Sequence, residues 1–304
     1  MSATATHLVL NASTTNPTAG SGDSLTITAK DSSDSTVTAY AGSKELTFGG
    51  ASAIGENEPT VTSSSGTAVA FGSKTSITFT NGVATVSGSN NGVMTLYKAE
   101  TASITVTDGT ISNGGGLSVT VKPAAAASFT VPTPTAQSAG SAFEETLTAL
   151  DAYGNTATGY AGEKTIAFSG PSNSPNATAP KYPASVSFSA GVGNTSITLY
   201  KAESTALTAK DGSISGSSGS FAVGPNSSAK LAFTQQPSGS TGGVAFATQP
   251  KVAVQDAFGN TVTSDSSSVT LSITTPEGAT LTCTSNPLAA SSGVASFAGC
   301  KIDK

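Results

Sequence analysis

Apolar residues alternate with serine or threonine over much of this 304-residue chain, and this alternation constrains its fold more than any other feature. The pattern is clear in Ser24–Ala29, Ser103–Thr107 and Ser118–Val121. Successive side chains of a β-strand point to opposite faces, so such segments form strands with one buried and one solvated face. Glycine, asparagine, aspartate and proline, which favour turns, lie between these segments. The sequence therefore predicts an all-β protein made of antiparallel strands.

Two short motifs recur along the chain, with offsets of 103 and 105 residues. The sequence Leu-Tyr-Lys-Ala-Glu occurs at Leu96–Glu100 and again at Leu199–Glu203. The sequence Asp-Ala-Tyr/Phe-Gly-Asn-Thr occurs at Asp151–Thr156 and again at Asp256–Thr261. A period of this length indicates tandem domains rather than one large fold. We predict three repeats, at 1–123 with an insertion near 51–73, at 124–225 and at 226–304.

Each predicted repeat has the size of an immunoglobulin-like β-sandwich. The second repeat contains about seven short alternating segments within about 100 residues, with turn residues between them. The boundaries at Val121–Pro123 and Val223–Pro225 leave only a few residues before the next strand. Short linkers of this kind favour a semi-rigid arrangement. We expect tandem immunoglobulin-like β-sandwiches arranged as a rod.

The third repeat is shorter than the second. In the second repeat, 48 residues separate Asp151 from Leu199, and the same count from Asp256 reaches Lys304. We therefore expect the third repeat to lack its last two strands, which would leave apolar faces and strand edges open. Two explanations stay open: the chain is a fragment of a longer protein, or a strand from another subunit completes the repeat.

The Asp-Ala-Tyr/Phe-Gly-Asn-Thr segment resembles the Asp-x-x-Gly-Asn turn of bacterial immunoglobulin-like repeats, the group that includes the invasin and intimin type domains. The resemblance extends to the layout of all three repeats, although Asp31–Asp34 departs from the motif. It implies an immunoglobulin-like fold and a bacterial surface protein, and the term adhesin enters by this analogy alone.

The composition argues against several classes of function. Only 10% of the residues are charged, 95 are serine or threonine, and none of the 13 basic residues is arginine. With a net charge of −5 and no arginine, the chain has no bidentate guanidinium groups for phosphate and no basic field, so we expect no nucleic-acid partner. No apolar run approaches the length that spans a bilayer, so we expect no membrane insertion in this segment. Met1–Thr6 lacks the features of a signal peptide.

Side chains suited to catalysis are scarce. The single histidine, His7, lies at the start of the first predicted strand, and we expect it to be exposed or half-exposed. Glu56 with Glu58 and Glu144 with Glu145 are the close glutamate pairs, and we expect both pairs at the solvated surface rather than in a glycosidase cleft. The sequence therefore predicts a protein that is not an enzyme and has no catalytic residues.

The two cysteines lie on either side of the turn-rich segment Pro287–Gly293. If Leu281–Ser285 and Ala295–Ile302 form an antiparallel hairpin, Cys283 and Cys300 come within one residue of facing each other. We expect a disulfide, which indicates an oxidising compartment; the alternative is two buried free thiols. Two thiols without further ligands cannot complete a zinc site.

Aspartates and tyrosines offer two further candidate sites. Several aspartates lie beside glycine or serine and could hold a structural calcium ion, but no Asp-x-Asp-x-Asp-Gly loop is present. We expect these side chains to cap turns, and no cofactor. Tyr97 and Tyr200 could stack on sugars, but we interpret them as residues at the edge of the core. The aspartates concerned are Asp31, Asp34, Asp108, Asp151, Asp211 and Asp256.

These observations favour a non-catalytic stalk or spacer segment of a secreted or surface-anchored bacterial protein of adhesin type, located outside the cell or on its surface. Its expected partners are the neighbouring repeats and, further, a host surface or carbohydrate. One alternative is a carbohydrate- or protein-binding module, with the insertion around 52–73 as the binding element. Another is a phage or virion fibre appendage.

Overall fold

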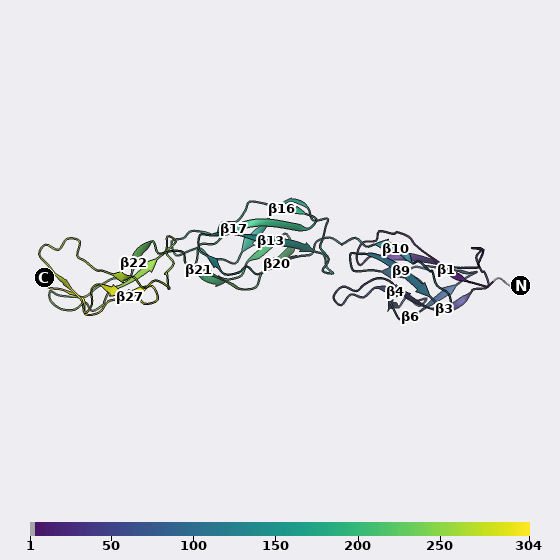
Figure 1. The fold of residues 1–304 in the computed structure, drawn as a ribbon, viewed down its shortest axis with the longest axis horizontal. Coiled ribbons are helices and arrows are strands. Elements are labelled where there is room, and N and C mark those ends of the chain that lie inside the picture. The colour runs from purple at the N-terminus through teal and green to yellow at the C-terminus, as the bar shows by residue number, and fades with distance from the viewer. Residues whose placement is uncertain (1–3) are drawn as a thin grey trace. The chain divides into compact units, whose positions relative to one another are not determined.

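The computed structural model describes residues 4–304, which form 28 β-strands and no helix (Figure 1). The prediction of an all-β protein is confirmed. The chain divides into two compact units. Unit 1 runs to Phe129 and also contains Thr148–Gly162 and Phe188–Val192; unit 2 comprises Thr130–Leu147, Glu163–Ser187 and Gly193–Lys304. Among the described residues, no helix is long and apolar enough to cross a membrane.

Unit 1 contains a β-sandwich of two sheets. In the first sheet the strand order is β1-β2-β8-β4-β5, and β7 also pairs with β2. The second sheet has the order β10-β9-β3-β6. The strands are β1 (His7–Ala12), β2 (Gly22–Lys30), β3 (Gly42–Gly49), β4 (Thr60–Thr62), β5 (Ala68–Ala70), β6 (Lys74–Phe79), β7 (Val83–Thr85), β8 (Val93–Thr95), β9 (Thr101–Thr107) and β10 (Leu117–Thr120).

The connections identify this sandwich as immunoglobulin-like. The chain crosses between the sheets from β2 to β3, from β6 to β7 and from β8 to β9, and the β4–β5 hairpin of the first sheet adds one crossing before it and one after it. Such crossings give the Greek-key connections of that fold. Alternate residues of both sheets meet in one core, among them Leu8, Ile27, Phe48 and Ile104. The predicted insertion contributes the β4–β5 hairpin, and Val61 of β4 is fully buried.

Strands β11 to β21 follow, and their alternating burial agrees with the period-two pattern. In unit 2, β12, β21 and β18 form one three-stranded sheet, and β15, β19 and β20 form another. The strands are β11 (Ser128–Thr130), β12 (Gln137–Ser138), β13 (Ala142–Leu150), β14 (Gly162–Lys164), β15 (Ala167–Ser169), β16 (Val186–Ser189), β17 (Val192–Thr198), β18 (Glu203–Thr205), β19 (Thr208–Asp211), β20 (Ile214–Ser217) and β21 (Phe221–Gly224).

The last part of unit 2 has smaller sheets, in the orders β22-β23-β27, β24-β26 and β25-β28. The pairing of Leu281 with Ile302 and of Thr282 with Lys301 places Cys283 opposite Cys300, and the two are joined by a disulfide as predicted. The strands are β22 (Lys230–Gln235), β23 (Lys251–Gln255), β24 (Ser268–Val269), β25 (Leu281–Thr282), β26 (Leu288–Ala289), β27 (Val294–Ser296) and β28 (Lys301–Ile302).

Three of the tight turns in the described residues share one backbone conformation. Gly82, Gly191 and Gly293 have φ values of 82°, 84° and 74°, and each follows a residue that also has positive φ. Two consecutive residues with positive φ form the hairpin turn that matches the twist of the flanking strands. A Cβ atom on Gly82 would lie 2.5 Å from the carbonyl oxygen of Val37, and one on Gly293 would lie 2.4 Å from that of Val262. The close backbone approach therefore requires glycine at these turns.

Candidate functional site

The Asp-Ala-Tyr/Phe-Gly-Asn-Thr motifs form two turns with the same internal hydrogen bonds, here called the asparagine turns (151–156 and 256–261). In the first, Oδ1 of Asp151 accepts the backbone N–H groups of Tyr153 and Asn155, both at 2.9 Å. In the second, Oδ1 of Asp256 accepts those of Phe258 and Asn260, both at 2.9 Å. An aspartate that caps the backbone of its own loop defines an Asx turn, so the local sequence fixes the shape of each turn.

The second carboxylate oxygen of each aspartate orients the asparagine. Oδ2 of Asp151 accepts Nδ2–H of Asn155 at 2.9 Å and the backbone N–H of Ala124 at 2.9 Å. Oδ2 of Asp256 accepts Nδ2–H of Asn260 at 2.8 Å. Burial alone would raise the pKa of Asp151, but the hydrogen bonds from Asn155, Ala124 and Tyr153 outweigh it and lower this pKa. Asp151 therefore holds Asn155 as a carboxylate.

Each asparagine binds the backbone of a Leu-Tyr-Lys-Ala-Glu segment, here called a tyrosine segment (96–100 and 199–203). Asn155 donates through Nδ2 to the carbonyl oxygen of Tyr97 at 2.7 Å and accepts through Oδ1 from the N–H of Ala99 at 2.7 Å. Asn260 binds Tyr200 and Ala202 in the same way, at 2.8 Å each. A primary amide offers one donor group and one acceptor, so it matches the N–H and C=O of an extended backbone.

An aromatic pair lies beside each set of hydrogen bonds. The ring centroids of Tyr97 and Tyr153 are 5.1 Å apart, and those of Tyr200 and Phe258 are 4.9 Å apart. A glycine with positive φ makes room for the incoming ring. A Cβ atom on Gly20 would lie 1.8 Å from Oη of Tyr153. The corresponding atom on Gly140 would lie 2.5 Å from Cε2 of Phe258.

Each tyrosine segment contains an internal ion pair. Lys98 pairs with Glu100 at 3.1 Å, and Lys201 pairs with Glu203 at 3.0 Å. Glu100 also accepts the backbone N–H of Ser52 at 2.6 Å. Burial raises the pKa of Glu100, but the hydrogen bond from Ser52 and the charge of Lys98 outweigh it and lower this pKa. The lysine and glutamate of the motif thus support the segment whose backbone the asparagine binds.

The asparagine turn at 256–261 makes additional hydrogen bonds beyond those to its tyrosine segment. Asn176 donates its backbone N–H to the carbonyl oxygen of Phe258 at 3.1 Å and its side-chain amide to that of Ala257 at 3.2 Å. Asn226 donates its backbone N–H to Oδ2 of Asp256 at 3.0 Å, and its Nδ2 donates to the carbonyl oxygen of Ala139 at 2.8 Å. The turn at 256–261 is therefore held from three sides within unit 2.

The corresponding segment at 31–36 keeps the turn but lacks the groups that make the contact. Oδ1 of Asp31 accepts the N–H groups of Ser33 and Ser35 at 2.9 and 3.0 Å, as in the asparagine turns. Serines stand where the other turns have the aromatic residue and the asparagine. Asp34 occupies the glycine position with a φ of 59° and pairs with half-buried His7 at 2.9 Å. This turn cannot form the contact with a tyrosine segment.

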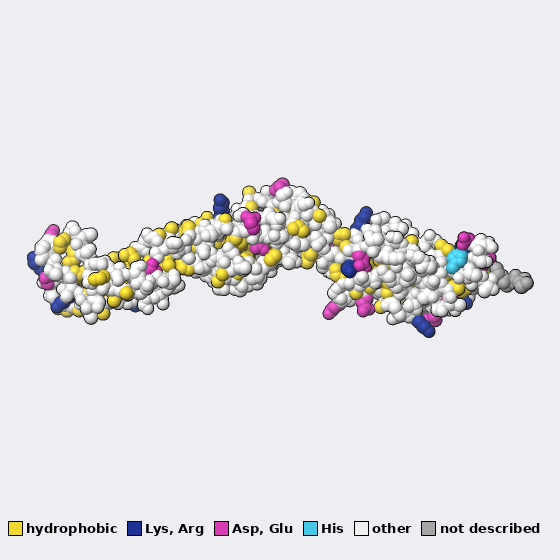
Figure 2. All heavy atoms as spheres, viewed as in Figure 1, with side chains coloured by type: hydrophobic (Ala, Val, Ile, Leu, Met, Phe, Trp, Pro, Cys, Tyr) yellow, Lys and Arg dark blue, Asp and Glu magenta, His cyan; other side chains and the backbone are white. Residues whose placement is uncertain are grey.

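The structure explains several residues predicted as candidate sites. Asp31, Asp151 and Asp256 cap their own turns as expected, and Asp108 accepts the N–H groups of Thr110 and Ile111. Within residues 4–304, no group of three or more His, Cys, Asp or Glu side chains is arranged to hold a metal ion. The surface is mostly uncharged, as the visible face shows (Figure 2).

The prediction for Glu145 was wrong. Glu56, Glu58 and Glu144 are exposed as expected, but Glu145 is only 4% exposed and its Oε1 has no hydrogen-bond partner. Burial raises the pKa of Glu145 to about 7. The residue lies on the buried face of β13, two positions before the core residue Leu147.

Sequence reasoning also missed the contact between the two motifs. Tyr97 and Tyr200 were expected at the edge of their own cores, whereas their rings pack against Tyr153 and Phe258. One signal was available: each tyrosine segment is followed by an asparagine turn in the next predicted repeat, and the turn of the first repeat lacks the motif.

The comparison with solved structures gives likenesses of low sequence identity. No family model and no curated protein matches the chain. Among solved structures, the Escherichia coli adhesin FdeC is 18% identical with a TM-score of 0.46, and the match covers 97% of this chain and 90% of that chain. The Yersinia pseudotuberculosis adhesin InvE is 15% identical with a TM-score of 0.31, covering 76% and 67%. Domains 4–9 of the surface layer protein SbsC are 17% identical with a TM-score of 0.30, covering 99% and 47%.

Proposed function

We propose that the chain is a non-catalytic spacer segment of a secreted or surface-anchored bacterial protein of adhesin type. One observation carries this proposal: the same contact between an asparagine turn and a tyrosine segment occurs twice, with the same atoms in the same roles. The partners of each repeat are then its neighbours in the chain.

The contact is suited to restricting motion between successive repeats. Asn155 and Asn260 are 6% and 4% exposed, so their hydrogen bonds are shielded from competing water. Breaking such a contact leaves buried donors and acceptors without partners, which costs free energy. A spacer module keeps its two neighbours at a fixed separation. For this it needs a hydrophobic core of its own and a stable contact with the next module.

The Cys283–Cys300 disulfide supports placement of the chain outside the cytoplasm. Disulfides persist in secreted proteins and at cell surfaces, and they are rare in reducing compartments. Few residues are charged, and serine and threonine are abundant. Such a surface has a weak electrostatic field and does not attract highly charged ligands.

Small-angle X-ray scattering on the 304-residue chain tests the spacer role. The double variant Asn155→Ala, Asn260→Ala should broaden the distribution of interatomic distances, because the repeats become free to reorient. The matched control is Asn194→Ala, since Asn194 is exposed and its side chain accepts a hydrogen bond from Thr146 on its own surface. A distribution that is unchanged in the double variant would refute the proposal.

A further inference from the structure

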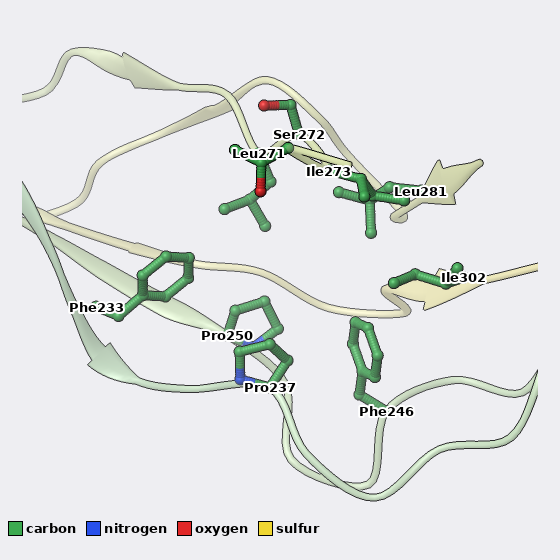
Figure 3. A pocket seen from close by; sticks show the side chains of 10 residues that line it. Phe233, Pro237, Phe246, Pro250, Leu271, Ser272, Ile273, Leu281 and Ile302 are labelled. Carbon is green, nitrogen blue, oxygen red and sulfur yellow. The ribbon is translucent and has the colours of Figure 1, made fainter. Parts of the chain in front are cut away.

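One buried position carries a carboxyl group where two equivalent positions are apolar. Leu25, Glu145 and Pro250 each lie six residues before the aspartate that begins one of the turns at 31–36, 151–156 and 256–261. Leu25 is 1% exposed, and Pro250 is buried and lines an apolar pocket (Figure 3). Glu145 is 4% exposed, and its Oε1 has no hydrogen-bond partner. The second copy of this position therefore has an ionisable group in the core.

In unit 1 an apolar contact fills this place. Leu25 of β2 donates its backbone N–H to the carbonyl oxygen of Gly92 at 2.9 Å, one step beyond the antiparallel pair of Ser24 and Val93. A Cβ atom on Gly92 would lie 3.8 Å from Cβ of Leu25. The pair of Leu25 and Gly92 has no polar side-chain atom, so it does not depend on pH.

In the second copy the same pair is Glu145 and Thr195. Thr195 lies four residues before the second tyrosine segment, as Gly92 does before the first. Thr146 donates its hydroxyl to Oδ1 of Asn194 at 2.7 Å across the neighbouring strands β13 and β17, which places Glu145 opposite Thr195. Thr195 is 6% exposed, and its Oγ1 also has no hydrogen-bond partner. Two buried polar side chains thus face each other, each with an atom that has no partner.

No charged side chain among the described residues compensates a carboxylate at this place. Burial raises the pKa of Glu145 to about 7, and a hydrogen bond from the backbone N–H of Thr146 lowers it in part. Strands β11 and β17, which flank β13, and β21, whose Phe221 packs against Phe143, carry no titratable side chain. An ionised Glu145 therefore needs water. The titratable residues on β11–β21 and on the segment paired with Thr198 are Glu144, Glu145, Glu163, Lys164, Lys181, Tyr182, Glu203, Lys210 and Asp211.

Both strands lead directly to the contact made by the second asparagine turn. Gly140 precedes β13, and its positive φ and missing Cβ leave space for the ring of Phe258. The second tyrosine segment follows β17, and its Ala202 donates its N–H to Oδ1 of Asn260 at 2.8 Å. Glu145 lies five residues after Gly140, which is roughly 16 Å along a strand. A separation of β13 from β17 therefore moves both parts of the surface that binds the turn.

We propose that Glu145 is a pH-sensitive switch for the contact between the second asparagine turn and its tyrosine segment. When the carboxyl group is protonated, it stays in the core opposite Thr195 and the contact is closed. When it is ionised, it draws water between β13 and β17, and the tyrosine segment releases Asn260. The first contact does not respond, because the apolar pair in unit 1 cannot ionise. This switch rests on the proposed spacer role, in which the contact restricts motion.

Amide hydrogen exchange of the full 304-residue chain, followed by NMR as a function of pH, tests the switch. Ala202 and Ala99 are the reporters, because Asn260 and Asn155 accept their N–H groups. The protection factor of Ala202, which corrects for the intrinsic exchange rate, should fall roughly 10- to 100-fold between pH 4.5 and about 7 and then level off. The closed state binds the proton more tightly than the open state only in this range. The protection factor of Ala99 should stay constant.

Variants at two adjacent positions identify the group responsible. Glu145→Gln cannot ionise, so Ala202 should stay protected over the whole range. Glu145→Leu introduces the residue of unit 1 and should give the same flat profile, which covers the case in which the glutamine variant does not fold. Glu144→Gln is the matched control, because Glu144 is exposed, and it should reproduce the profile of the original chain.

Three outcomes would overturn the switch. The first is a flat Ala202 profile in the original chain, and the second is a falling profile that Glu145→Gln leaves unchanged. The third is an equal loss of protection at Ala209, which is 0% exposed in β19, because it would show that the whole sandwich unfolds. The scattering test of the spacer role compares asparagine variants at one pH, so the switch and the spacer role can fail independently.

Discussion

Asn155 binds the backbone carbonyl of Tyr97 at 2.7 Å across 58 residues of sequence, and Asn260 repeats this bond to Tyr200 across 60. Each asparagine is also held by the aspartate that shapes its turn. The carboxylate fixes the amide, and the amide fixes the neighbouring backbone. Two buried hydrogen bonds to the tyrosine segment therefore depend on one six-residue turn.

Removing the amide should destabilise this contact. Asn155→Ala leaves the N–H of Ala99 and the carbonyl oxygen of Tyr97 without their partner, so we expect the free energy of unfolding to fall by about 2–3 kcal/mol. Urea denaturation followed by circular dichroism measures the change. Asn194→Ala, on the exposed face of β17, should change stability by no more than about 0.5 kcal/mol. Equal effects of the two variants would contradict this role of Asn155.

Gly20→Ala should displace the aromatic ring of the asparagine turn. The added Cβ atom would lie 1.8 Å from Oη of Tyr153, so the ring must move away from Tyr97. Gly72→Ala is the matched control, because Gly72 also has positive φ but nothing lies within 4 Å of its Cβ position. We expect Gly72→Ala to cost about 1 kcal/mol and Gly20→Ala about 1–3 kcal/mol more. NMR shifts of the Tyr97 and Tyr153 rings should change only in the Gly20 variant.

Glu145 should make stability fall as pH rises. Its pKa is about 7 in the folded protein, above the ordinary value of 4.5, because burial disfavours the carboxylate. The folded state therefore holds the proton more tightly, and its advantage is complete below the unfolded pKa and lost as pH rises to about 7. Glu145→Gln should remove this dependence and stabilise the protein at pH 8 by roughly 1–3 kcal/mol.

The exposed neighbour Glu144 provides the control for this experiment. Glu144→Gln should leave the slope of the melting temperature against pH between 4.5 and 8 unchanged, whereas Glu145→Gln should flatten it. If both variants keep the slope of the original chain, Glu145 is not the group responsible.

The disulfide should contribute to the stability of the last part of unit 2. Cys283 and Cys300 are 17 residues apart, and a closed loop of this size stabilises a fold by about 3 kcal/mol in the chain-entropy estimate. Adding a reductant should lower the free energy of unfolding of the original chain by about 3 kcal/mol. The double variant Cys283→Ser, Cys300→Ser should be equally destabilised and should no longer respond to reductant. An original chain that is insensitive to complete reduction would contradict this expectation.

Local patterns in the sequence predicted the strands and the disulfide, because both depend on residues close together in the chain. The pairing of Leu281 with Ile302 needs only a hairpin, which the turn-rich segment between them indicates. The contact of Asn155 with Tyr97 depends on distant segments, and a tyrosine beside apolar residues looks like part of its own core. Glu145 was predicted at the surface because its side chain is charged. Its position in the strand alternation indicates the opposite, since it shares the buried face of β13 with Leu147 and Ala149.

The asparagine turns bind main-chain atoms, and this has a consequence for how such a chain evolves. Tyr97 and Ala99 contribute their C=O and N–H groups to Asn155, so the hydrogen bonds require a backbone conformation and not a particular side chain. A gene duplication that spans residues 151–203 would copy an asparagine turn together with a tyrosine segment. Such a copy would bring both partners of the contact with it, so its hydrogen bonds would need no compensating mutation elsewhere in the chain.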